Sequence, residues 1–138
     1  YTLRATAGWA SSPRNYLEAS AAAEAVLELG RQRDGVRLVA AVPFHGQENR
    51  FSPADRERFR SVLAAAAETV VLSPVYHRGC YAVRNNYLTD NARVLVAWYD
   101  GSSGGTHYTV RRALRRGLEV VNLRPEAPCL PVPAPTLF

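Results

Sequence analysis

The feature that most constrains this sequence is a regular alternation between short, valine-rich apolar runs and segments with a helical pattern. Two of the runs, 36–42 and 69–73, end directly at a proline, and a third, 93–99, is almost entirely apolar. Strands that alternate with helices through short connections pair in parallel with right-handed crossovers. The pattern therefore predicts an α/β fold: a three-layer sandwich with a mostly parallel sheet and helices on both faces.

Local signals set the expected boundaries of the elements. Ser52, Pro53 and Asp55 are typical of a helix start, and Gly117 is typical of a helix end. The run 93–99 is apolar enough to predict a strand buried on both faces. We expect a loop over 7–16. The expected strands are 1–6, 36–42, 69–73, 93–99 and 118–123, and the expected helices are 17–31, 53–67, 81–89 and 106–116.

Length and composition favour one globular domain. The chain has 138 residues, of which 47% are hydrophobic and 21% charged. We expect a single domain over 1–123 and an extended, proline-rich tail over 124–138. No apolar run is long enough for a membrane helix, so no membrane partner is expected. No secretory signal is visible, which favours a cytoplasmic location with Cys80 and Cys129 as free thiols.

All 17 basic residues are arginine, and the formal net charge is +5. A nucleic-acid surface is one interpretation, since arginine suits phosphate geometry. The arginines are scattered, however, and the codon usage of a GC-rich genome explains the absence of lysine more simply. The one dense group lies where a helix is expected to end, so a solvated face that complements the helix dipole is the favoured interpretation. This group is Arg111, Arg112, Arg115 and Arg116.

The loop after Tyr99 carries the most informative candidate site. Ligands of open parallel sheets bind at the carboxyl ends of the strands. Here Gly104 and Gly105 precede an expected helix, and Thr106 adds a hydroxyl. Glycines let a ligand approach the backbone, and helix N-termini favour anions, so a phosphate is the natural occupant. The alternative is that the glycines only form a tight turn.

The loops after two other strands offer further candidates at the same end of the sheet. Phe44 either stacks on a base or is an ordinary core aromatic. Arg84 and Asn85 lie near an expected helix start, where they either clamp a phosphate and read a base or sugar edge, or are a surface arginine and a capping asparagine. His77 and Cys80 have metal-like spacing but no second pair of ligands, so neither a metal site nor a cofactor is predicted.

An ordered set of short motifs resembles the YpsA-like bacterial proteins of the SLOG superfamily, which also holds the DprA proteins and the LOG phosphoribohydrolases. The similarity covers roughly residues 22–123. The matching residues are Val42-Pro43-Phe44-His45-Gly46-Gln47-Glu48, Leu72-Ser73, Tyr76, Gly79-Cys80, Arg84-Asn85, Asp90, Tyr99-Asp100-Gly101, Gly104-Gly105-Thr106 and Tyr108-Thr109.

This resemblance implies a Rossmann-like fold and a nucleotide-derived ligand. Thr106 matches the threonine of the LOG glycine motif, and Arg84 is placed like the substrate-handling arginine of those enzymes. Thr109 stands where they carry a catalytic glutamate. The usual first strand and glycine-rich turn of the family are not matched near residues 1–10. The expected ligand contacts are Phe44, Ser73, Arg84, Asn85, Asp100, Gly104, Gly105, Thr106 and Thr109.

Three functions follow as hypotheses. The first is binding of a nucleotide or ADP-ribose-like ligand by a homodimer, with no catalytic residue assigned. The second is N-glycosidase activity on a nucleoside monophosphate, for which Glu24 and Glu48 are the available carboxylates. The third, less favoured, is single-stranded DNA binding as in the DprA relatives. It lacks the interleaved aromatic residues typical of such surfaces.

Overall fold

A computed structural model describes the backbone of residues 3–7 and 13–124, and the side chains of residues 21–124. It confirms the predicted Rossmann-like α/β class, because helices alternate with strands and the strand pairs within these residues are parallel. The sequence predicted one sheet, whereas the hydrogen-bonded ladders form two, β1-β2-β3 and β4-β5. The chain divides into two compact units: unit 1 ends at Arg84 and unit 2 begins at Asn85.

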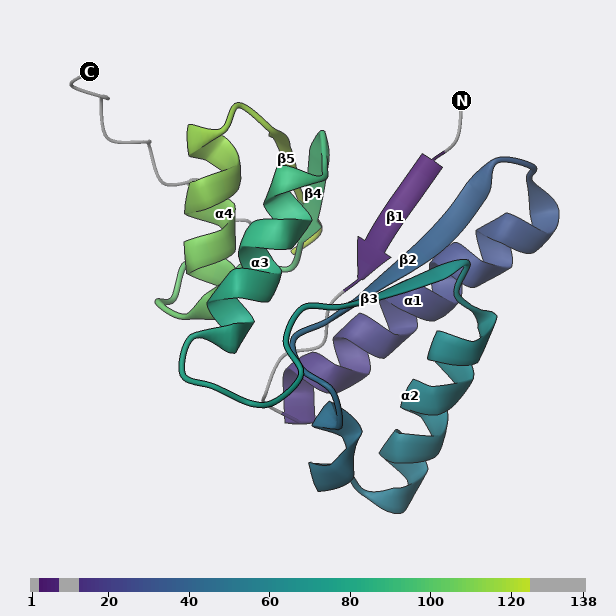
Figure 1. Cartoon of the computed structure of the whole chain (residues 1–138). Coiled ribbons are helices and arrows are strands. Elements are labelled where there is room, and N and C mark those ends of the chain that lie inside the picture. The colour runs from purple at the N-terminus through teal and green to yellow at the C-terminus, as the bar shows by residue number, and fades with distance from the viewer. Residues whose placement is uncertain (1–2, 8–12, 125–138) are drawn as a thin grey trace. The chain divides into compact units, whose positions relative to one another are not determined.

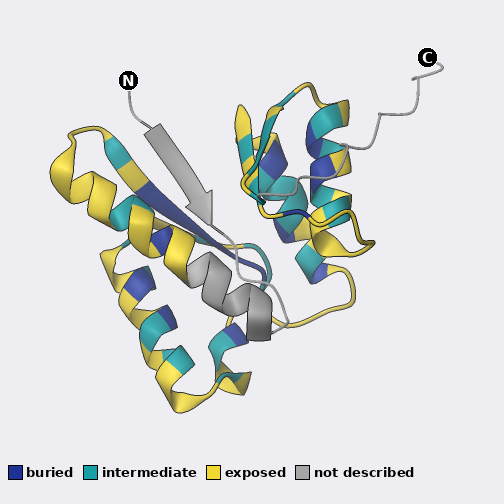
Figure 2. Ribbon diagram, turned by 180° about the vertical axis from the view of Figure 1, so that it is seen from behind, coloured by how far each residue is buried: buried dark blue, intermediate teal, exposed yellow. Residues whose placement is uncertain are grey.

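Unit 1 is a three-stranded parallel sheet with β2 at its centre (Figure 1). β2 pairs with β1 from Leu3↔Val36 onward and with β3 from Val39↔Glu68 onward. A central strand has neighbours on both edges, and β2 is accordingly more buried than β3 (Figure 2). The elements are β1 (Leu3–Ala7), α1 (Pro13–Gln32), β2 (Val36–Val42), the short 3-10 helix η1 (Gln47–Arg50), α2 (Pro53–Ala65) and β3 (Glu68–Val71).

The core of unit 1 lies between α1, α2 and one face of β2. Alternate β2 side chains point to the same face, and there they meet buried residues of both helices. Phe59 of α2 is 1% exposed and meets Phe51 edge-on, with ring centroids 5.5 Å apart. The buried cluster comprises Ala23, Leu38, Ala40, Val42, Phe59 and Val62.

The predicted start of α2 is confirmed. The Ser52 hydroxyl accepts a hydrogen bond from the Asp55 backbone N–H at 3.2 Å, and Pro53 occupies the first helical position. Arg56 then donates from its side chain to three backbone carbonyls, including that of Glu48 at 3.2 Å. The cap and this arginine fix α2 to η1, and hence to the chain that leaves the carboxyl end of β2.

Unit 2 is a smaller parallel pair of strands with helices on one side (Figure 1). α4 packs against both strands, and α3 runs alongside α4 and is hydrogen-bonded to it. The unit boundary falls inside α3, between its fifth and sixth residues. The elements are α3 (Cys80–Asp90), β4 (Val94–Ala97), α4 (Gly105–Arg115) and β5 (Glu119–Asn122).

Two expectations about local structure are wrong. The strand near 93–99 is not buried on both faces, since Val96 and Trp98 are 59% and 54% exposed. Its other face is the one covered by the helices of unit 2. The predicted loop over 7–16 is wrong at Ala7, the last residue of β1, and over 13–16, because α1 begins at Pro13. Proline is favoured in the first turn of a helix, so Pro13 was a signal for the start of α1, but the polar residues around it favoured a loop.

The predictions for the two cysteines, the proline-rich tail and a membrane helix remain, and some of them fall on residues that the structure does not describe. Cys80 is a buried free thiol, as expected. Residues 8–12 and the proline-rich segment 125–138, with Cys129, lie outside the described residues. Among the helices in the described ranges, none combines the length and apolar character that crossing a bilayer requires.

Candidate functional site

The glycine turn before α4 has a backbone conformation that favours glycine. Gly104 adopts φ 146° and ψ −165°, a region that other residues enter only with strain. It is the N-cap of α4 and supplies no side-chain cap. The first N–H groups of an α-helix have no carbonyl partner within the helix, and the helix dipole makes this end positive. Gly104, Gly105 and Thr106 are exposed, so these donors can be reached from solvent.

Asn85 lies beside this turn within unit 2. A Cβ atom built on Gly105 would stand 3.9 Å from Asn85 Nδ2, which is an ordinary van der Waals distance. The structure thus brings together two residues that the sequence placed at the site separately. Asn85 is the sixth residue of α3, so its interpretation as a capping asparagine is wrong.

The loop between β4 and the turn is held by several side chains, of which the sequence did not single out Asn122 and His107. The Asn122 amide accepts from the Tyr99 N–H at 3.1 Å and donates to the Tyr99 carbonyl at 2.9 Å. The Tyr99 phenol, on a side chain only 3% exposed, is hydrogen-bonded to the His107 ring. Asp100 accepts from the Ser102 N–H at 2.9 Å. The signal available in the sequence was Asn122, a polar residue that ends an otherwise apolar strand.

Thr109 has a local role in α4. Its hydroxyl donates to the Gly105 carbonyl at 2.9 Å, one turn earlier in the helix. A hydroxyl bonded in this way stabilises its own helix turn and carries no charge. Thr109 therefore offers no carboxylate next to the glycine turn.

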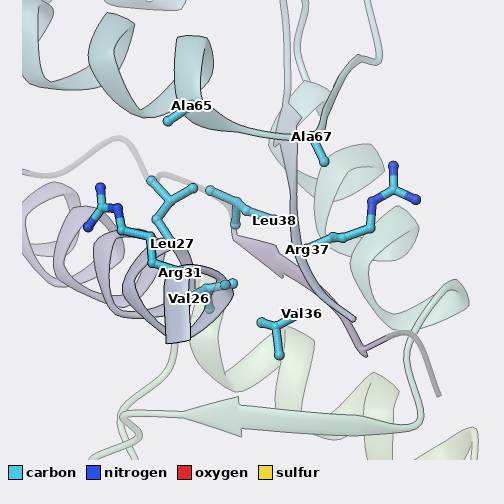
Figure 3. Close-up of a pocket in the computed structure, with 9 residues that line it drawn as sticks. Val26, Leu27, Arg31, Val36, Arg37, Leu38, Ala65 and Ala67 are labelled. Atoms are coloured by element: carbon cyan, nitrogen blue, oxygen red, sulfur yellow. The ribbon is translucent and has the colours of Figure 1, made fainter. Parts of the chain in front are cut away.

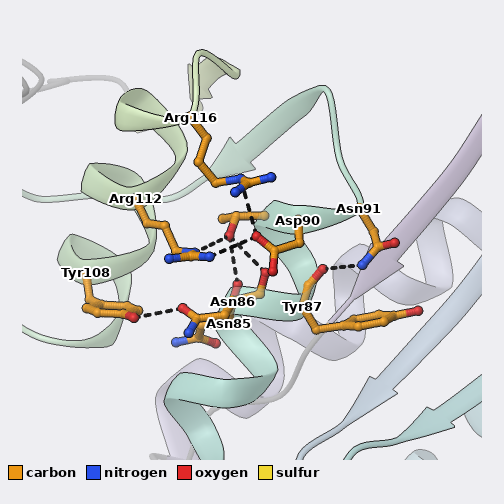
Figure 4. Close-up of polar contacts among 9 residues, drawn as sticks. Asn85, Asn86, Tyr87, Asp90, Asn91, Tyr108, Arg112 and Arg116 are labelled. Atoms are coloured by element: carbon orange, nitrogen blue, oxygen red, sulfur yellow. Dashed lines mark hydrogen bonds and ion pairs between the residues drawn. The ribbon is translucent and has the colours of Figure 1, made fainter. Parts of the chain in front are cut away.

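Helices α3 and α4 are joined by a cluster of polar contacts (Figure 4). Arg112 donates from Nη2 to Asp90 at 2.9 Å and from Nε to the Thr89 hydroxyl at 3.0 Å. Arg116 Nε lies 3.3 Å from the same carboxylate, and the Tyr108 phenol donates to the Asn86 side chain at 2.7 Å. The arginines lie at the end of α4, as predicted, and Arg116 is exposed, as a solvated face requires, whereas Arg112 is only partly exposed.

In unit 1, the chain segments that leave β2 and β3 lie next to each other. The His45 N–H donates to the Ser73 carbonyl at 3.0 Å, and the Ser73 hydroxyl donates to the Val75 carbonyl at 2.8 Å. A hollow of about 370 Å³ opens here, and it is lined by His45, Val71, Leu72, Ser73 and Pro74. This is the end of a parallel sheet at which ligands are expected to bind.

Phe44 lies at the same end, inside a group of aromatic rings. Its ring is half-buried and meets Tyr76 and Tyr81 edge-on, with centroid distances of 5.4 Å and 6.1 Å. Phe44 thus follows the end of β2, as the sequence predicted, whereas Ser73, predicted as the last residue of a strand, lies just beyond β3, which ends at Val71. Phe44 makes an edge-on contact with each of the two tyrosines, so its ring packs between them.

Arg84 is buried, at 3% exposed, so the alternative of a surface arginine is wrong. Burial lowers the pKa of Arg84 to about 10, and the neighbouring Tyr81 and Cys80 oppose this change. Burial also raises the pKa of Tyr81, with a smaller contribution from Cys80. Both shifts have the same cause, because removing a charge-bearing group from water disfavours its ionised form.

A second hollow, of about 250 Å³, opens at the opposite end of β2, between α1 and the end of α2 (Figure 3). Its walls are mainly aliphatic, and Arg31 and Arg37 are also among the residues that line it. Arg31 is paired with Glu28 at 2.6 Å. This hollow is at the amino end of the strand, away from the loops that follow β2 and β3.

N-glycosidase chemistry needs an available carboxylate, and a metal site needs a group of ligands. Glu24, a carboxylate considered for an N-glycosidase, accepts two hydrogen bonds from Arg58, at 2.7 Å and 2.8 Å. The hydrogen bond from Arg58 lowers the pKa of this carboxyl. Among residues 21–124, no group of three or more His, Cys, Asp or Glu side chains is arranged to hold a metal ion.

The comparison with known protein families finds no match. The chain is similar to a UPF0398 protein of Bacillus pumilus (strain SAFR-032), with 28% identity over 94 residues. The aligned region covers 66% of this chain and 50% of that protein, so the chain spans about half the length of this curated relative. The relative's name states no activity.

Proposed function

We propose that this chain binds a phosphate-bearing, nucleotide-derived ligand of the ADP-ribose type at the glycine turn of unit 2. The observation that carries the proposal is the exposed N-terminus of α4 behind Gly104 and Gly105. Its backbone donors and dipole suit a phosphate, and the absence of side chains at two successive positions permits close approach. Asn85, adjacent to Gly105, adds an amide for a sugar or phosphate oxygen.

The sequence motifs support the same class of ligand. They resemble the YpsA-like branch of the SLOG superfamily, and the similarity to a UPF0398 protein is compatible with that resemblance. Binding is favoured over N-glycosidase chemistry because Thr109 replaces the LOG glutamate and its hydroxyl bonds to the Gly105 carbonyl. Glu24, one of the alternative carboxylates, is engaged with Arg58.

Gly105→Asp gives a test in which folding and binding respond in opposite directions. A Cβ at this position has room, and an acid in the first turn of a helix stabilises it by about 0.3–1 kcal/mol. The same charge repels a phosphate. We therefore expect calorimetry to show that ADP-ribose binds the parent chain, while Gly105→Asp keeps or gains thermal stability and loses binding.

Gly105→Asn is the matched control, because it has nearly the shape of aspartate without the charge. It should retain much more affinity for ADP-ribose than Gly105→Asp does. Equal affinity of the aspartate variant and the parent would refute a phosphate at this turn. So would a parent chain that binds none of ADP-ribose, AMP and inorganic pyrophosphate at millimolar concentration.

A further inference from the structure

Gln47, the first residue of η1, is a buried amide without a hydrogen-bond partner. The residue is 3% exposed, and neither Nε2 nor Oε1 makes a hydrogen bond within the described part of the chain. Buried polar groups in folded proteins are almost always paired, because an unpaired one loses its bonds to water without replacement. An orphaned amide of this kind therefore points to a group that binds it.

The amide belongs to the aromatic group at the carboxyl end of β2. Gln47 acts on the neighbouring Tyr81 phenol and lowers its pKa, against the larger effect of burial, but the geometry of this contact falls short of a hydrogen bond, so the amide stays unsatisfied. Phe44 contacts both Tyr81 and Tyr76. Tyr76 is 58% exposed, so its ring is the one most accessible to a ligand. The hollow lined by His45 and Ser73 opens beside the same loops.

These groups combine the two features that recognise a nucleobase. A carboxamide presents a donor and an acceptor side by side, and glutamine pairs in this way with N6 and N7 of adenine. Exposed aromatic rings stack on the faces of bases. We propose that unit 1 contains an adenine-binding site, in which Gln47 hydrogen-bonds the edge of the base and Tyr76 stacks on its face.

This inference rests on the proposed function for the class of ligand, but it uses none of the residues of the glycine turn. Adenosine, which has no phosphate, isolates this site from the proposed phosphate site.

The experiment measures the binding of adenosine and inosine to the whole chain by calorimetry. Inosine carries a carbonyl in place of the N6 amino group, so the edge that pairs with the amide in adenine then offers two acceptors and cannot form both hydrogen bonds. The parent chain should prefer adenosine by about tenfold or more, the usual size of one bidentate base contact. Gln47→Leu should bind adenosine more weakly by a similar factor and lose the preference over inosine.

Two controls separate this site from general effects. Gln32→Leu makes the same change at an exposed glutamine of α1 and should leave adenosine binding unchanged. Gly105→Asp should also leave adenosine binding unchanged while it weakens ADP-ribose binding, because the added charge repels the phosphates and does not affect the base. If adenosine binding is absent but ADP-ribose binding depends on Gly105, the adenine site is refuted and the proposed function stands.

Two measurements remain decisive if Gln47→Leu does not fold. Tyr76→Ala changes an exposed side chain, and it should weaken adenosine binding by about tenfold through lost stacking. Nuclear magnetic resonance of the parent should show the Gln47 side-chain amide protons shifting on addition of adenosine. Unshifted Gln47 protons at saturating adenosine, or equal affinities for adenosine and inosine, would overturn the inference.

Discussion

Replacing Asp90 with alanine removes the carboxylate that joins α3 to α4. In the structure this group is shared by Arg112, at 2.9 Å, and Arg116, at 3.3 Å (Figure 4). The Asp90 side chain is 43% exposed, so solvent screens both pairs. Exposed ion pairs each stabilise proteins by about 0.2–1 kcal/mol, and the sum over the two pairs predicts a loss of about 0.4–2 kcal/mol for Asp90→Ala.

Arg112→Ala should cost more than Asp90→Ala. Arg112 is the less exposed partner, at 27%, and its Nε also donates to the hydroxyl of Thr89, a residue that is only 1% exposed. Removing that donor leaves a buried acceptor with one bond fewer, which adds about 1 kcal/mol. The pairwise coupling between Asp90 and Arg112 should be about 0.5–1 kcal/mol, since only their direct contact is shared.

The assay is a double-mutant cycle in urea, with unfolding followed by circular dichroism. We expect the coupling at low salt, and a smaller coupling in about 1 M sodium chloride, where charges are screened within about 3 Å. Arg111, an exposed arginine of α4 outside the described Asp90 contacts, supplies the control cycle with Asp90 and should show no coupling. Full additivity of Asp90→Ala and Arg112→Ala at low salt would refute the assignment of this contact as a stabilising link.

Two further predictions concern single positions. Gly104→Ala should lower the free energy of unfolding by about 1–3 kcal/mol, because φ 146° and ψ −165° strain any residue with a Cβ. Urea denaturation measures this change, and an unchanged midpoint would contradict the assigned conformation. Burial raises the pKa of Tyr81 above 10.0, so the folded state favours the neutral phenol. The contribution of the neutral phenol to the free energy of unfolding is therefore complete below about pH 10 and is lost as the pH rises through the higher pKa of the folded state. Tyr81→Phe should therefore lose less thermal stability than the parent between about pH 9 and about pH 11, and equal losses would refute the shift.

The order and type of the helices and strands could be predicted because local signals were strong. Ser52 and Pro53 marked the start of α2, and the proline after 36–42 marked the end of β2. The division of the strands between two sheets was not predictable in this way, since it depends on which ladders form and not on any one segment. The exposure of Val96 and Trp98 was missed for the same reason, because an apolar run does not reveal how many of its faces are covered.

The residues of the candidate site could be predicted from the sequence, but the contacts that hold the loop next to them could not. The glycine turn and Asn85 were identified from residue type and position, and the structure places them side by side. The contacts that hold the loop, from Asn122 to Tyr99 and from Tyr99 to His107, join residues that are distant along the chain or on different elements. No local pattern indicates such pairs.

The central claim is that phosphate binds the backbone N–H groups at the start of α4, and backbone amide resonances measure this directly. Titrating the isotopically labelled chain with ADP-ribose, and separately with inorganic pyrophosphate, should shift the amide signals of Gly105, Thr106 and His107 most strongly. The same signals should stay in place in Gly105→Asp, whose fold is retained. Binding that leaves these three amides unshifted in the parent chain would contradict the account.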